Sequence, residues 1–426
     1  MSAYFCSMEE KKAIYIIGAG MSGLTAAVTL QKQGFEPVIL EQSAHVGGRL
    51  QTTNLNGVIL DHGFQVMLDA YPAVNEFLDV AALELIKFVP GSIVHMNGKA
   101  HKIGDPRRNS GFLWSTLIAG VGSLKDKWLM FSLSRKLTKK SLAAIFETPE
   151  QTTLQYLQEF GFSEKIMNQF FKPFYTGIFL ETELATSSRM FEFIFKMFSE
   201  GNATIPAGGI QAIAKQLAAQ IPSQNIRLRT AVKSVVGDVI TLEDGTTIHS
   251  DYTIVACAPG AVVPNLAGEK LAWHAVTNLY FETDYTGEDM PIINLIANED
   301  SLVNNFHCLH DVFPGHKNVL SASVVKSHNL NDAKLAERVT QQLRELADVK
   351  VGDLIKMFHI NKALPALETL QYSMQPTETQ LTENIYLAGD QLSNGSLNAA
   401  MLNGKAAAQA VISRIDDNVV AALPVM

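Results

Sequence analysis

A glycine-rich turn near the start of the chain constrains the fold more than any other feature. An apolar run, 13–17, leads directly into Gly18-Ala-Gly20-Met-Ser-Gly23, and a helical pattern then extends to residue 33. In such a unit the first glycine permits a tight turn, the second lets the backbone approach a pyrophosphate, and the third lets the helix lie close to the strand. The free N–H groups at the helix N-terminus favour phosphate. The stretch therefore predicts a strand–turn–helix unit that holds an ADP group.

A carboxylate and a second pair of glycines extend this predicted site. Glu41 ends the apolar run 37–40, where an acidic side chain can accept hydrogen bonds from the ribose hydroxyls. Gly47 and Gly48 free the backbone to pass close to a ligand, and Arg49 can present a planar fork of donors to a phosphate. The alternative for the whole region is a glycine turn in an ordinary α/β domain.

The far end of the chain carries a similar arrangement. An apolar strand over 384–388 ends at Gly389 and Asp390, and a helix that begins near Asn398 runs to Arg414. The Asp390 carboxylate can accept a hydrogen bond from a sugar-alcohol hydroxyl, and the helix can direct its positive end at the ligand. Two such segments predict a ligand longer than one ADP group, although Asp390 as a plain turn residue remains the alternative.

Composition limits the other possibilities. A chain of 426 residues with 47% hydrophobic side chains can bury large cores, and two domains are the natural expectation. The net charge of −8 argues against a nucleic-acid surface. Three dispersed cysteines (Cys6, Cys257, Cys308) suggest neither a disulfide framework nor a metal site, and they favour a reducing, cytoplasmic location. We expect no membrane-spanning helix and no signal peptide.

The middle of the chain predicts helices and then a sheet. Residues 72–199 are mostly helical in pattern, whereas strands joined by turns over 271–325 predict an antiparallel sheet. Aromatic side chains that can form either core or a substrate wall are concentrated at Phe160, Phe162, Phe170, Phe171 and Phe174.

One stretch of the helical region allows two interpretations. Over 111–140, apolar residues such as Phe112, Trp114 and Ile118 precede a basic run from Arg135 to Lys140. An ordinary amphipathic helix with a solvated charged face is one interpretation. A docking surface for a bilayer or for a source of hydrophobic substrate is the other.

These motifs carry a family resemblance. Val46-Gly-Gly-Arg-Leu-Gln-Thr resembles the GGR motif of the flavin-containing amine oxidase superfamily, which includes amine oxidases, protoporphyrinogen oxidase and phytoene desaturase-like enzymes. The segment from Leu387 to Ala408 is similar to its C-terminal FAD motif, and Pro206-Ala-Gly-Gly and Ala363-Leu-Pro are similar to further parts of it. The resemblance spans residues 13 to about 411. It is specific for the superfamily but not for a substrate.

The resemblance implies a Rossmann-like α/β FAD-binding domain and a discontinuous α+β substrate domain with an antiparallel sheet and helices. We expect residues 1–70, 201–268 and 375–426 in the FAD-binding domain, and 71–200 and 269–374 in the substrate domain. It also implies noncovalent FAD, adenine recognised by the backbone near Val232, and Gly63 and Phe64 beside the isoalloxazine ring. The full set of expected FAD contacts is Gly18, Gly20, Gly23, Glu41, Gly48, Arg49, Gly63, Phe64, Val232, Gly389, Asp390, Ser396, Asn398 and Ala399.

Departures from the family pattern bear on the reaction. Ser396 stands where amine oxidases resemble one another in placing an aromatic side chain, and the strand 273–281 lacks the lysine that they commonly have there. Both departures weaken an amine-oxidase interpretation. Ser396 resembles the serine of phytoene desaturase-like members, whereas Ala399 stands where those members usually have glycine.

The sequence therefore predicts an FAD-dependent oxidoreductase that accepts a hydride from a hydrophobic substrate, as in C–C desaturation. Three alternatives remain open: an amine or protoporphyrinogen oxidase-like activity, a redox-neutral double-bond isomerase, and a flavin-binding protein without catalysis. His62 and Tyr280 are the only catalytic candidates, and a structural role for His62 is the alternative. We expect a hydrophobic small molecule as partner, no nucleic acid, and leave peripheral membrane contact and oligomeric state open.

Overall fold

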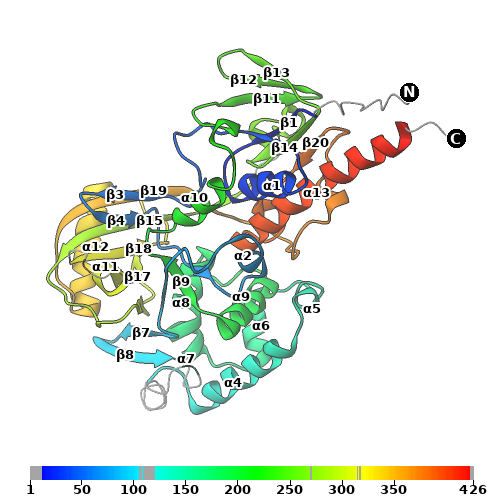
Figure 1. The fold of residues 1–426 in the computed structure, drawn as a ribbon. Helices are drawn as coiled ribbons and strands as arrows, with labels where there is room; N and C mark the ends of the chain where they lie inside the picture. The colour runs from blue at the N-terminus through cyan, green and yellow to red at the C-terminus, as the bar shows by residue number, and fades with distance from the viewer. Residues whose placement is uncertain are drawn as a thin grey trace, which may run out of the picture.

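Two β-sheets, at different ends of the molecule, organise the fold (Figure 1). The computed structural model describes residues 12–104, 108, 120–268, 271–313, 315 and 318–422, with side chains as far as residue 417. The predicted apolar stretch from Phe112 to residue 119 lies outside the described residues. None of the described helices combines the length and the apolar character needed to cross a membrane.

The first sheet has five strands in the order β10-β2-β1-β14-β20, and every neighbouring pair is parallel. Its strands are short and apolar, as in sheets that are covered on both faces. They are β1 (Ile14–Ile17), β2 (Val38–Leu40), β10 (Ile226–Arg227), β14 (Tyr252–Val255) and β20 (Ile385–Leu387).

Helices and a small sheet cover the two faces of this parallel sheet. On one face lie α1 (Met21–Gln31), α10 (Ala212–Ala218) and α13 (Leu397–Ala422), which share a core with strand β1. On the other face lies an antiparallel sheet of β11 (Val232–Val236), β12 (Val239–Leu242) and β13 (Thr247–His249). A turn with Arg229 at φ 54° separates β10 from β11.

The second sheet has seven strands in the order β19-β15-β18-β17-β16-β7-β8. Neighbours are antiparallel, as predicted, except that β16 pairs in parallel with β7, which comes from the mostly helical region. The strands are β7 (Gly91–Met96), β8 (Lys99–Gly104), β15 (Trp273–Thr283), β16 (Ile293–Ile296), β17 (Val303–Cys308), β18 (Val319–Val324) and β19 (Val351–Pro365).

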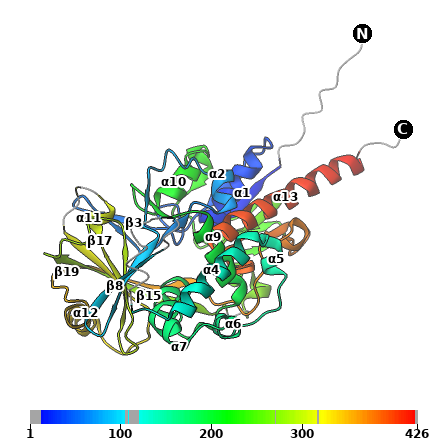
Figure 2. The same cartoon turned by 90° about the horizontal axis from the view of Figure 1, so that it is seen from below.

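Helix α12 (Asp332–Ala347) covers one face of this sheet through Leu335, Val339 and Leu343. Its N-cap is Asn331, whose side chain accepts a hydrogen bond from Lys334 N. Figure 2 places this sheet and α12 at one end of the molecule and the C-terminal part of α13 at the other.

The predicted helical region forms a third body of the structure (Figure 1). It comprises α2 (Pro72–Phe77), α4 (Leu124–Lys139), α5 (Leu142–Phe146), α6 (Thr153–Phe160), α7 (Glu164–Ile166), the π-helix η1 (Met167–Phe171), α8 (Lys172–Phe179) and α9 (Ser188–Glu200). The short elements that connect these layers are β3 (Thr52–Leu55), β4 (Val58–Asp61), β5 (Met67–Leu68), β6 (Leu85–Lys87), β9 (Ala203–Pro206), α11 (Leu309–Val312) and η6 (Asp390–Leu392).

The predicted fold class, an α/β dinucleotide-binding layer joined to an α+β layer, is confirmed. We propose that the parallel sheet belongs to the FAD-binding domain and the seven-stranded sheet to the substrate domain, with the residue boundaries given above.

Candidate functional site

A cavity of about 1040 Å³ connects the parallel sheet with the helical region. At one end it is lined by Gly18, Gly20 and Glu41, and at the other by aromatic side chains such as Phe170 and Phe174. Its volume is at the upper end of the usual range for a small-molecule site. The cavity is therefore large enough for more than one small molecule to lie end to end along it.

The glycine turn at the first end has the geometry that its sequence predicted. Gly18 has φ 104°, which favours glycine, and a Cβ on Gly23 would lie only 2.0 Å from Gly18 O. A Cβ on Gly20 would meet no atom within 4 Å, so this glycine leaves open space beside the turn. Helix α1 starts at Met21 without a side-chain cap, which leaves its N-terminal N–H groups for an anion.

Glu41 is held at the end of β2 by backbone donors. Its Oε2 accepts a hydrogen bond from Ala19 N at 2.7 Å, and its Oε1 accepts one from Ser43 N at 2.8 Å. The residue is 8% exposed and lines the cavity. These two bonds fix the orientation of the carboxylate, and each oxygen retains a lone pair for a ligand hydroxyl.

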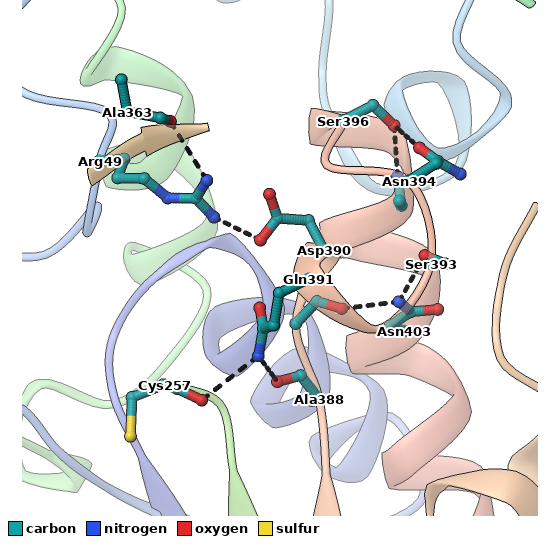
Figure 3. Close-up of polar contacts among 12 residues, drawn as sticks. Arg49, Cys257, Ala363, Ala388, Asp390, Gln391, Ser393, Asn394, Ser396 and Asn403 are labelled. Atoms are coloured by element: carbon teal, nitrogen blue, oxygen red, sulfur yellow. Dashed lines mark hydrogen bonds and ion pairs between the residues drawn. The ribbon is translucent and has the colours of Figure 1, made fainter. Parts of the chain in front are cut away.

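Arg49 and Asp390 form an ion pair across the cavity wall, although 341 residues separate them in the sequence (Figure 3). Asp390 is almost fully buried, whereas Arg49 is partly exposed. The guanidinium also lies 5.4 Å from the ring centroid of Trp273 and donates to Ala363 O at 3.4 Å. Arg49 thus joins the second glycine pair to the C-terminal motif.

The loop after β20 is held by an asparagine that the sequence analysis did not single out. Asn403 Nδ2, from α13, donates to Gly389 O at 2.7 Å and to Ser393 Oγ at 2.8 Å (Figure 3). Asn403 Oδ1 accepts from Met374 N. Asn403 lies within the C-terminal segment 387–408, but its residue type alone did not indicate these long-range contacts.

Ser396 is the N-cap of α13. Its Oγ accepts a hydrogen bond from Ala399 N at 3.0 Å and donates one to Asn394 Oδ1 at 2.6 Å (Figure 3). Ser396 and the neighbouring Leu397 line the cavity, so the positive end of this helix faces it. Because an aromatic side chain cannot cap a helix in this way, the serine serves the local structure as well as the cavity.

Most of the predicted site residues meet at the cavity wall, and some do not. Those that line it are Gly18, Gly20, Glu41, Gly48, Arg49, Gly63, Phe64, Gly389, Asp390 and Ser396. Gly23 lies behind the turn, and Val232 and Ala399 are not among the lining residues. Asn398 Oδ1 is used to accept a hydrogen bond from Ala73 N.

The two catalytic candidates differ in their access to the cavity. His62 lines it, with Nε2 2.9 Å from Thr53 Oγ1 and its ring stacked on Phe358, and burial lowers the pKa of its imidazole. Tyr280 is buried in the core beneath the sheet, where its hydroxyl donates to Asp61 O at 2.7 Å. A phenol held in this way has no direct path to a ligand.

Asp61 lies beneath the site and joins two of the motifs. Its Oδ1 accepts hydrogen bonds from Thr52 Oγ1 and, at 3.0 Å, from Ile210 N, at the end of the Pro206-Ala-Gly-Gly loop. Its Oδ2 is buried without a partner. Burial raises the pKa of this carboxyl to about 6, against the lowering effect of the Thr52 and Ile210 hydrogen bonds.

The wall of the cavity beyond Gly63 is formed by the seven-stranded sheet and the helices that face it. Every strand of the sheet contributes at least one lining residue. In the order from β19 to β8 these residues are Ile360, Val276, Ser323, Asn305, Ile293, Ser92 and Ile103. The facing helices contribute Met130, Phe131, Phe170, Phe174, Phe195 and Phe198. Trp273 and Lys362 also line the cavity, and the sequence analysis had not assigned them a role.

These residues fit an extended dinucleotide. The open space beside Gly20, the uncapped α1 terminus and the oriented Glu41 carboxylate suit an ADP group. The buried Asp390 and the α13 terminus lie farther along the same cavity, as a flavin dinucleotide requires. Together the fold and the site define a flavoprotein of the dinucleotide-binding α/β type.

Comparison with known proteins agrees with this class. The family model described as flavin containing amine oxidoreductase matches residues 21–412. Protoporphyrinogen oxidase 2 of Arabidopsis thaliana is 40% identical over 68 residues, 16% of this chain and 13% of that protein. A 4,4'-diapophytoene desaturase of Methylomonas sp is 33% identical over 85 residues, 20% of this chain and 17% of that protein. The matched segments thus span less than a fifth of these curated relatives.

Solved structures match over nearly the whole chain. A double mutant of putrescine oxidase aligns with a TM-score of 0.70 at 15% identity, covering 94% of this chain and 99% of that one. An oxidoreductase from Methanosarcina mazei also gives 0.70, at 18% identity, covering 94% and 100%. These similarities establish the fold.

The chain therefore belongs to the flavin containing amine oxidoreductase family. The predictions of this family, of FAD as its cofactor and of an FAD-dependent oxidoreductase as its class of enzyme are confirmed at the level of the family.

Proposed function

We propose that this protein oxidises a hydrophobic substrate, with a hydride passing to FAD as in C–C desaturation. The observation that carries the proposal is that one continuous cavity joins the dinucleotide residues to a long apolar section. A substrate in that section would lie next to the end of the site at which Gly63 and Phe64 are expected to meet the ring.

The residues of this chain would bind the dinucleotide, orient the substrate and exclude water. Gly18, Gly20, Glu41, Arg49 and Asp390 would hold the dinucleotide. When bound, FAD supplies the hydride-accepting centre. The sheet and the aromatic helices would align an apolar chain and exclude water, so that the catalytic contribution is mainly positioning. The second hydrogen of the desaturated bond would leave as a proton to solvent, because no side chain that lines the cavity is assigned as a general base.

The charged residues that line the cavity distinguish between amines and acids as candidate substrates. Among the described lining residues only Glu41 and Asp390 carry carboxylates, and both lie at the dinucleotide end. The helical end instead contains Arg108 and Lys127. An ammonium substrate would find no counter-ion there, which disfavours amines. Carboxylates on a hydrophobic ring system would find cations, so a porphyrinogen-type acid, as the name of the Arabidopsis relative suggests, is the second candidate.

The test is an anaerobic titration of the purified FAD-loaded protein with apolar polyenes, porphyrinogens and an amine panel. We expect bleaching of the oxidised flavin spectrum by a polyene or a porphyrinogen, without peroxide release on amines. Peroxide release on amines would overturn the proposal. Activity only after prior flavin reduction, with no net consumption of reductant, would indicate an isomerase, and bound FAD that nothing reduces would indicate a protein without catalysis.

A matched pair of variants tests whether the aromatic section binds the substrate. Phe174 lines the cavity, whereas Phe160 is a partly buried phenylalanine of the same helical core that does not. Phe174→Ala should weaken substrate binding about tenfold or more, because a large apolar contact is lost. Phe160→Ala should lower stability with little change in substrate affinity. Equal substrate affinities in the two variants would contradict the assignment.

A further inference from the structure

Helix α4 carries an unusual concentration of exposed apolar side chains. Of the seven large apolar residues that are most exposed in the described part of the chain, three belong to it: Leu124 at 74%, Trp128 at 65% and Phe131 at 46%. Their spacing of four and three residues places them on one face of the helix. The opposite face is ordinary core, where Leu129, Leu133 and Leu137 are buried.

The same outward face becomes basic in the second half of the helix. Arg135 and Lys139 continue the line of Leu124, Trp128 and Phe131 at helical spacing, and all five are exposed. The single acidic residue of the helix, Asp126, is buried in hydrogen bonds with Ser123 and Ser163. The outward surface of α4 is thus apolar and cationic on a chain whose net charge is −8.

This surface is continuous with the cavity. Phe131 is exposed to solvent and also lines the cavity, and Met130 and Ser134, on the adjacent side of α4, line it as well. Phe131 therefore provides an apolar contact between the outward face of α4 and the aromatic section of the cavity. In Figure 1 α4 lies at the outer edge of the helical region, away from both chain termini.

We propose that α4 docks this protein on an anionic phospholipid surface, with Leu124, Trp128 and Phe131 at the level of the acyl chains and the basic second half of the helix against the headgroups. Trp, Phe and Leu combined with cationic residues are the composition of helices that lie in the membrane interface. The cations are complementary to anionic lipid headgroups. The further step, entry of substrate from the bilayer beside Phe131, rests on the proposed function.

The test is co-sedimentation of the FAD-loaded full chain with vesicles of phosphatidylcholine alone or of an equimolar mixture with phosphatidylglycerol. We expect binding to the mixed vesicles that weakens with salt. Leu124→Ser/Trp128→Ser should reduce it about tenfold or more, and Arg135→Glu/Lys139→Glu by a similar factor. The matched control is Lys334→Glu/Arg344→Glu, which reverses two exposed cations on α12, a helix of the same length, and should bind like the wild type.

Retained FAD absorbance and an unchanged unfolding temperature establish that each variant is folded. Equal binding of the α4 and α12 variants, or no binding of folded wild type to either vesicle, would overturn the proposal. So would a change of oligomeric state without a change in vesicle binding, because α4 would then contact a second copy. The measurement needs no substrate, so a failure of the proposed oxidation would leave it intact.

Discussion

At the scale of single residues, Asp61 combines a raised pKa with a central position. It lies under the site and joins the β3–β4 ribbon to the loop before α10 through Thr52 and Ile210. Since its second oxygen is buried without a partner, the charged form is disfavoured. This carboxyl therefore makes the free energy of unfolding fall as the pH rises, whereas a salt-bridged aspartate makes it rise with pH.

The first prediction concerns this dependence. Because the pKa is raised from 3.8 to about 6 in the folded state, the folded protein binds the proton more tightly, and its stability should fall as the pH rises from 4 to 6. The largest effect of a shift of this size is about 3 kcal/mol. Asp61→Asn, which keeps an acceptor for Thr52 and Ile210, should remove this contribution. Urea unfolding of the wild type and of Asp61→Asn between pH 4 and pH 7 measures this contribution. The same change in the free energy of unfolding with pH in both proteins would refute the prediction.

The second residue-scale prediction concerns Glu41. Both of its oxygens accept backbone N–H groups, so Glu41→Gln would set an amide N–H against one of these donors and also remove an acceptor for a ribose. We expect FAD affinity to fall about tenfold or more. Fluorescence of FAD released on dilution measures this loss. Glu243→Gln, at an exposed turn, is the control and should retain FAD like the wild type.

At the scale of elements, the contact between α1 and α13 brings the two ends of the chain together. A Cβ on Gly404 would lie 2.1 Å from Ser22 O, so only glycine allows these helices their present separation. Gly404→Ala should force them apart and destabilise the fold by about 1–3 kcal/mol. FAD affinity should fall as well, because the N-termini of both helices border the cavity. Thermal unfolding with and without FAD tests this, and Gln409→Ala, exposed on the same helix, should change neither quantity.

The sequence was informative where a motif is local. The glycine turn depends on residues close together in the chain, and its geometry follows from backbone chemistry. The pairing of β7 with β16 joins segments about 200 residues apart and has no local pattern. For the same reason the Arg49–Asp390 pair was not predicted, although each residue was assigned separately.

Burial explains the site residues that the sequence misjudged or missed. Tyr280 and the lining residue Val276 lie on the same strand, and position alone did not tell which side chain turns toward the cavity. Trp273, at the start of that strand, lines the cavity, and the Arg49 guanidinium lies over its ring. Such facts depend on tertiary packing, which a pattern of residue types along one strand does not contain.

At the scale of the whole molecule, the dinucleotide site is assembled from both ends of the chain. Its lining draws residues from three segments, which lie within 18–22, 41–50 and 389–400. A ligand that contacts all of them should stabilise these layers together, by about 2.7 kcal/mol when free FAD is at a hundred times its dissociation constant.

Calorimetry of the protein at increasing FAD concentrations should therefore show one unfolding transition, whose temperature rises with the FAD concentration. An unfolding temperature that does not depend on FAD concentration would contradict this expectation. Adenosine diphosphate, which lacks the flavin half, is the matched control and should give a smaller shift.

The cavity crosses the seven-stranded sheet from edge to edge, with side chains from every strand in its wall. Adjacent strands are about 4.8 Å apart, so if the proposed substrate lies along this row, each further strand that it reaches would correspond to about 4.8 Å of its length. A bulkier side chain on one of these strands would shorten the available length of the cavity by about the distance between two strands, while the reactive end of the substrate stayed at Gly63. Relatives with the same chemistry could thus differ in chain-length preference through a single substitution in this row.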